Sequence, residues 1–70
     1  MSDALQGFRD EYRMVREQAN RVSAELEARI ETGKVGPAYE EANRTLLNCL
    51  LYWQARERGV LADLTHALAR

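Results

Sequence analysis

The stretch Gly33-Lys34-Val35-Gly36-Pro37 divides the chain into two arms of nearly equal length. Glycine suits the left-handed backbone position that ends a helix, so Gly33 predicts the end of a first helix. Proline is favoured in a first helical turn, because the N–H that it lacks would be unpaired there anyway. A connection this short makes two helices antiparallel neighbours. We therefore predict an all-α helical hairpin, with long helices at about residues 3–32 and 37–68 and a turn at residues 33–36.

The arm before the turn carries an apolar stripe at alternating spacings of three and four residues. This spacing places side chains on one face of a helix, and its repeat of seven is the pattern of a coiled-coil seam. The stripe consists of Leu5, Phe8, Tyr12, Val15, Ala19, Val22 and Leu26. We therefore expect the first helix to bury one side against the second.

The arm after the turn is apolar over a wider arc than one partner helix covers. One stripe faces the first helix and is formed by Leu46, Leu50, Trp53, Val60 and Leu64. A helix that is apolar beyond such a stripe is buried on more than one side. The predicted interface to another subunit consists of Leu47, Leu51, Leu61, Leu68 and Tyr52.

Folding the two arms symmetrically about the turn predicts which residues meet. Val22 then lies opposite Leu47, and Gly59 lies beside the bulky Phe8 and Tyr12. We expect one continuous second helix, in which Gly59 leaves room for those aromatic rings. A break at Gly59 is the alternative, because glycine costs about 1 kcal/mol relative to alanine inside a helix.

The size of the chain predicts self-association. Ordering costs about 1.5 kcal/mol per residue, and two helices bury little area to offset it. Residues 1–70 would form one helical-hairpin domain that assembles as a homodimer or larger oligomer, as in a four-helix bundle. A single cysteine, Cys49, and no visible secretory signal indicate a reducing cytoplasm. The longest apolar run, near residues 46–53, is too short to span a bilayer, so we expect no membrane partner.

Glu57 falls near the centre of the apolar face of the second helix, and the symmetric fold puts it across from Tyr12. A buried carboxylate needs a partner, which Arg16 or an arginine of another subunit could supply. We therefore predict a buried polar group of Glu57, Tyr12 and Arg16. A salt bridge that sets the register is favoured over a functional carboxylate.

Two further sets of side chains suggest ligands. Arg9, Arg13 and Arg16 form a ridge beside the seam, which oligomer symmetry would repeat and which could bind phosphates. The competing interpretation is charge pairing, because acidic residues interleave with the arginines and the net charge is −1. Asp63 and His66, three residues apart, have a metal-ligand spacing, but a di-metal bundle also needs inward-facing glutamates such as Glu57. We expect no metal and no cofactor.

The sequence holds no Ser/His/Asp arrangement, no CxxC pair and no phosphate-binding glycine loop. We therefore expect a non-enzymatic, homo-oligomeric interaction protein that presents helix faces to itself and to another protein. A small adaptor, an inhibitor or a phage- or plasmid-type regulator fits this description. The alternative is a binder of nucleic acid or of a small anionic, nucleotide-like ligand, through the arginine ridge repeated across subunits.

Overall fold

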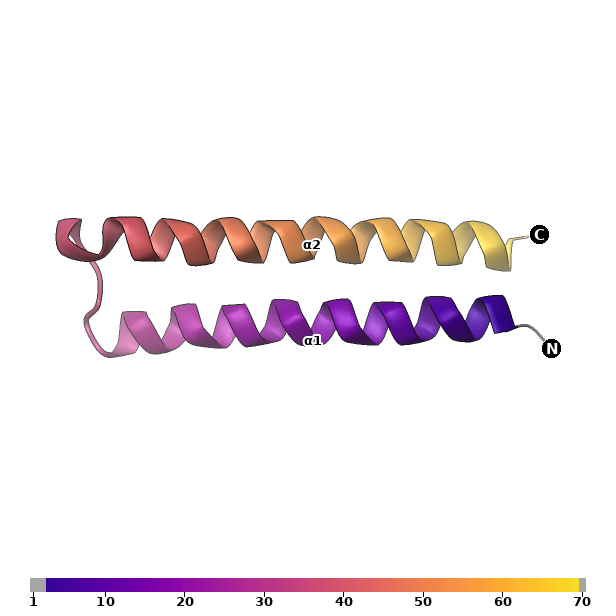
Figure 1. Cartoon of the computed structure of the whole chain (residues 1–70), viewed down its shortest axis with the longest axis horizontal. Helices are drawn as coiled ribbons and strands as arrows, with labels where there is room; N and C mark the ends of the chain where they lie inside the picture. Colours follow the sequence, from indigo (N-terminus) through magenta and orange to yellow (C-terminus); the bar gives the residue numbers. More distant parts are fainter. Residues whose placement is uncertain (1–2, 70) are drawn as a thin grey trace.

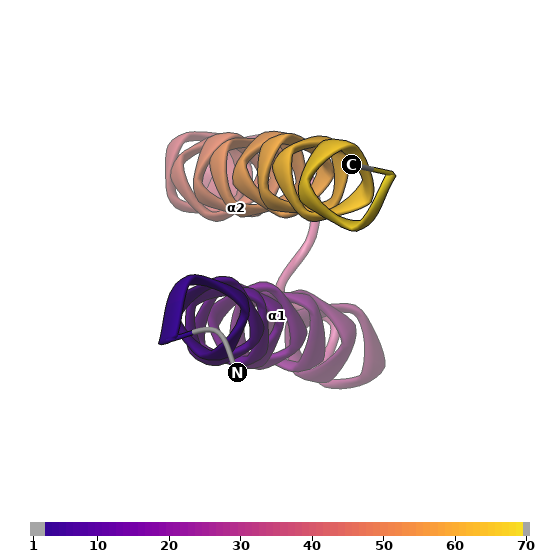
Figure 2. The ribbon, with the colours of Figure 1, turned by 90° about the vertical axis from the view of Figure 1, so that its right-hand side faces the viewer.

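The computed structural model describes residues 3–69, and within them the chain is an antiparallel pair of long helices. Helix α1 spans Asp3–Glu31 and helix α2 spans Glu40–Leu68, with a short 3₁₀ helix, η1 (Pro37–Tyr39), before α2. The helices lie side by side as a rod of 52 × 14 × 12 Å, with the turn at one end (Figure 1). Seen along the rod, they form a single layer (Figure 2). The predicted all-α helical hairpin is confirmed.

Two glycines shape the turn. Gly33 has a φ of 73° and Gly36 a φ of 97°, both in the left-handed region that favours glycine. The N–H of Lys34 donates to the carbonyl of Arg29 at 2.8 Å, which closes the last turn of α1. The predicted helix start at Pro37 needs a correction, because residues 37–39 form a 3₁₀ turn and the α-helical hydrogen bonding begins at Glu40.

Buried and half-buried side chains follow one stripe on each helix, at alternating spacings of three and four. On α1 the stripe contains Phe8, Tyr12, Val15, Ala19, Val22, Leu26 and Arg29. On α2 it contains Asn43, Leu46, Leu50, Trp53, Glu57, Val60, Leu64 and Ala67. Val15 is fully buried, and the core centres on it and on Ala19, Val22 and Val60. The seam predicted for α1 is therefore the side that meets α2.

The register between the helices differs from the symmetric fold. Arg29 donates from Nε to Oδ1 of Asn43 at 2.5 Å, so these two residues lie at one level. Equal steps along both helices then place Val22 opposite Leu50 rather than Leu47, which is 47% exposed. The reason is the 3₁₀ turn, whose residues lie between the glycine turn and the start of α2. They lengthen the connection on the α2 side only, so each residue of α1 faces a residue further along α2 than the symmetric fold predicts.

Gly59 lies in an open position within a continuous α2. A β-carbon built there meets no neighbouring atom within 4 Å, so the expectation that Phe8 and Tyr12 need this space is wrong. Gly59→Ala should therefore raise the free energy of unfolding by about 1 kcal/mol, because alanine loses less backbone entropy in a helix. Urea unfolding followed by circular dichroism measures the difference. Gly33→Ala is the control: its positive φ should make that variant less stable. A destabilised Gly59→Ala would contradict the open environment.

Candidate interaction surface

Large aliphatic side chains remain exposed along one flank of the hairpin, which we call the apolar flank: Ile30, Leu47, Leu51, Leu61 and Leu68. Their exposed fractions run from 39% for Leu61 to 65% for Ile30. Leu47, Leu61 and Leu68 are separated by multiples of seven residues, and Leu51 follows Leu47 by one helical turn, so they share one side of α2. Four of the five residues predicted for the subunit interface therefore lie together, and α1 leaves them uncovered.

A groove opens on this flank at the turn end of the rod. Its volume is about 750 Å³, and Ile30 from α1 and Leu47 from α2 line the same space. The remaining lining residues are Leu26, Arg29, Gly36, Pro37, Glu40, Asn43 and Arg44. Arg44 donates to Glu40 at 2.6 Å at the rim of the groove. The groove is largely apolar with a charged rim, which is the anatomy of a protein-binding surface.

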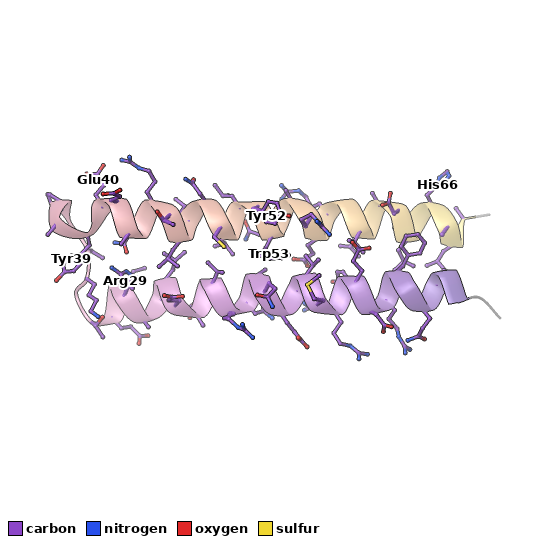
Figure 3. The ribbon with its side chains drawn as sticks, viewed as in Figure 1. Arg29, Tyr39, Glu40, Tyr52, Trp53 and His66 are labelled. Carbon is purple, nitrogen blue, oxygen red and sulfur yellow. The ribbon has the colours of Figure 1, made fainter. Side chains whose placement is uncertain are left out.

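A polar cluster holds the turn against both helices and forms one wall of this groove. Asn43 accepts from Arg29, and its Nδ2 donates to the carbonyl of Lys34 at 2.9 Å. The Arg29 guanidinium lies 5.8 Å from the centre of the Tyr39 ring, and the two side chains lie together at the turn in Figure 3. This cluster was not predicted from the sequence. The sequence does contain a sign of it, because Arg29 and Asn43 continue the three-four spacing of the stripes on the two helices.

Tyr52 does not join the leucines. Its ring packs edge-on against Trp53, with ring centres 5.1 Å apart (Figure 3). Its hydroxyl accepts from Arg56 at 3.3 Å, and Arg56 also donates to Glu11 of α1 at 3.0 Å. The hydrogen bond to Tyr52, with that to Glu11, raises the pKa of Arg56 above its ordinary value. Tyr52 thus belongs to the flank where Arg56 bridges the helices, and not to the apolar flank.

The predicted buried group around Glu57 has a different geometry. Glu57 lies in the seam of α2 but is half-buried, and Arg16 is exposed. The Arg16 guanidinium lies over the ring of Tyr12, 5.9 Å from its centre, in a cation–π contact. Among residues 5–69 no charged or polar side chain is buried. Within one chain, Arg16 therefore pairs with Tyr12, and a partner for Glu57 from another subunit stays a prediction.

The arginine ridge is exposed along α1. Arg9, Arg13 and Arg16 border a shallow hollow together with Tyr12 and Asn20, and Glu17 lies at its edge. Among the described residues, the ion pairs join Arg44 to Glu40 and Arg56 to Glu11. The ridge therefore presents three guanidinium groups that these pairs leave available.

The residues proposed for a metal do not converge. Asp63 and His66 are exposed, and His66 points away from α1 (Figure 3). Over the part of the chain that the structure describes, no group of three or more His, Cys, Asp or Glu side chains could hold a metal ion.

Neither described helix combines the length and the apolar character that crossing a membrane requires. No protein-family model, curated protein or solved structure matches the chain.

Proposed function

We propose that the protein is a non-enzymatic interaction protein of the cytoplasm that assembles with itself through the apolar flank. The single observation behind this proposal is the row of exposed aliphatic side chains that α1 leaves uncovered: Ile30, Leu47, Leu51, Leu61 and Leu68. Continuous exposed apolar surface on a small protein marks an interaction site. Full burial of a leucine contributes about 1.5–3 kcal/mol, so a symmetric contact that uses each side chain twice gains substantially.

The proposed assembly is a homodimeric four-helix bundle. Two hairpins that meet through their apolar flanks give each helix a second neighbour, which supplies the burial that a single layer lacks. The outer faces of such a bundle remain free for a further protein. A small adaptor, an inhibitor or a phage- or plasmid-type regulator would act in this way.

Light scattering of the wild-type protein at micromolar concentration tests this proposal. We expect a mass of at least twice the 8.0 kDa of the chain. A folded monomer by light scattering and circular dichroism would overturn the proposal.

A second candidate function is binding of an anionic ligand by Arg9, Arg13 and Arg16. The observation that favours it is the set of ion pairs within the hairpin, which engages Arg44 and Arg56 instead of the ridge. Guanidinium groups bind phosphate with two parallel hydrogen bonds, so a nucleic acid or a nucleotide-like molecule would suit them.

We expect this ridge to bind nucleic acid weakly, with a Kd above about a micromolar at moderate salt, which is the range of non-specific binding. The physical reason is the small number of phosphates that three arginines can neutralise, together with the net charge of −1. Fluorescence anisotropy of labelled single-stranded RNA and duplex DNA measures the affinity. Sub-micromolar binding that is lost in Arg9→Ala/Arg13→Ala/Arg16→Ala would make this candidate the leading function.

A further inference from the structure

Resting on the proposed self-association, we infer that the two copies meet antiparallel, with the turn of one beside the open end of the other. The two-fold axis would be perpendicular to the rod and cross it at the level of Gln54. With this axis, α2 packs on α2 of the partner and α1 packs on α1 of the partner. The charges and the spacing of apolar residues along the flank both favour this orientation.

The positive charge on this flank gathers over the half of the rod away from the turn. Arg9 and Arg16 precede Ile30 by multiples of seven residues and so share its side of α1, and Arg13 lies one turn after Arg9. On α2, the exposed Arg58 lies one turn before Leu61.

The turn end of the same flank carries little net charge, because Arg29, which lines the groove, offsets Glu27. The Glu27 carboxylate lies one turn before Ile30. Arg44 is paired with Glu40 at 2.6 Å, so this pair adds no net charge. The flank is therefore basic over the half away from the turn and close to neutral at the turn end.

A parallel dimer would bring the basic halves of both copies together. Each copy contributes four arginines there, and like charges across an interface oppose association. An antiparallel dimer instead separates the basic halves along the rod and places Arg9 against the turn end of the partner, where Glu27 lies. Repulsion between the basic halves therefore favours the antiparallel arrangement.

The same axis brings two leucines of the apolar flank together. Leu47 and Leu61 lie seven residues on either side of Gln54, so an axis at Gln54 puts Leu47 opposite the partner's Leu61. The level of Gln54 corresponds to that of Gln18 on α1, from the register in which Arg29 meets Asn43. Arg9 and Glu27 lie nine residues on either side of Gln18. One axis thus pairs leucine with leucine on α2 and arginine with glutamate on α1.

Disulfide cross-linking tests the axis. In a Cys49→Ala background, which leaves one thiol per chain, Gln54→Cys places the two sulfurs beside each other across the axis. Air oxidation catalysed by copper phenanthroline should link these chains into a covalent dimer. Thr65→Cys is the matched control on the same side of α2. In an antiparallel dimer its two copies lie ~33 Å apart along the rod, at 1.5 Å per residue, and should not cross-link.

A charge exchange supplies an independent measurement. Arg9→Glu alone and Glu27→Arg alone should each raise the dimer dissociation constant about tenfold, because each change makes two like-charged pairs per dimer. The combined Arg9→Glu/Glu27→Arg protein should recover wild-type affinity in sedimentation equilibrium. Both positions are exposed in the single hairpin, so circular dichroism should show folded helices in all three proteins.

The outcomes separate this inference from the proposed function. A monomeric wild type would overturn both. A dimeric wild type in which Thr65→Cys cross-links as well as Gln54→Cys, or in which Gln54→Cys does not cross-link, would overturn the antiparallel axis alone. Failure of the double charge exchange to restore affinity would do the same.

Discussion

Leu47→Glu combined with Leu51→Glu is expected to convert the protein into a largely unfolded monomer. The two leucines are 47% and 53% exposed in the single hairpin, so the substitutions leave its internal seam unchanged. In the proposed dimer they lie within the interface, where each carboxylate would be poorly solvated and near another like charge. Loss of the interface removes the burial that compensates for ordering 70 residues, and a single layer of two helices is marginal alone.

Light scattering and circular dichroism measure this effect. The double variant should show a monomer mass, and its helical signal should fall at concentrations where the wild type is folded. Glu17→Ala with Arg21→Ala is the matched control, because both residues are exposed on α1 away from the apolar flank. An oligomeric wild type together with an undisturbed Leu47→Glu/Leu51→Glu protein would show that the interface lies on another face.

Glu57→Leu is expected to raise the free energy of unfolding by about 1–2 kcal/mol. Glu57 occupies a seam position of α2, at the level of the fully buried Val15, and the residue is half-buried. Among the described residues it forms no ion pair, since those ion pairs join Arg44 to Glu40 and Arg56 to Glu11. Leucine adds apolar contact and removes a partly desolvated charge. A leucine that is only partly buried contributes less free energy than a fully buried one, and we therefore expect no more than about 1–2 kcal/mol.

Thermal and urea unfolding of Glu57→Leu, with Glu57→Ala beside it, check this expectation. Glu57→Ala should change stability little, because none of the arginines that the structure describes forms an ion pair with the carboxylate. If both variants lose several kcal/mol, an arginine of another subunit pairs with Glu57 in the assembled protein. In that case the structure of a single hairpin lacks the partner that defines the role of Glu57.

The hairpin itself could be predicted from the sequence because two independent signals agree. The glycines and the proline of the turn and the three-four spacing of α1 each indicate helices that fold back on one another. The register could not be predicted in the same way. It depends on the backbone path between Gly33 and Glu40, where Gly36 and the 3₁₀ turn lengthen one side of the connection. If α2 is shifted by a few residues along α1, the apolar stripes of the two helices still face each other. The apolar pattern is therefore compatible with both registers.

The apolar flank was predicted in large part, because helical spacing places Leu47, Leu51, Leu61 and Leu68 on one side of α2. Tyr52 was misplaced for a physical reason. Consecutive helical residues point about 100° apart, so the residue after Leu51 turns toward the other flank. There, a hydrogen bond from Arg56, which also reaches Glu11, keeps Tyr52 on that side. The helical spacing alone gives the side on which Tyr52 lies, whereas its contact with Arg56 and Glu11 depends on the register and could not be predicted from that spacing.

The narrow cross-section of the rod has a consequence for hydrogen exchange. The rod measures 14 × 12 Å across and consists of two helices, so every backbone amide lies close to solvent. Its hydrogen bond can therefore open by local fraying of the helix, which allows the amide to exchange. One end is closed by the turn and by the Arg29–Asn43–Lys34 hydrogen bonds, whereas the other ends in two separate helices. Amide protection in a single hairpin should therefore decay in one direction, from the turn toward the open end. In an antiparallel dimer each fraying end would lie beside a closed one, and protection should become nearly uniform along the rod.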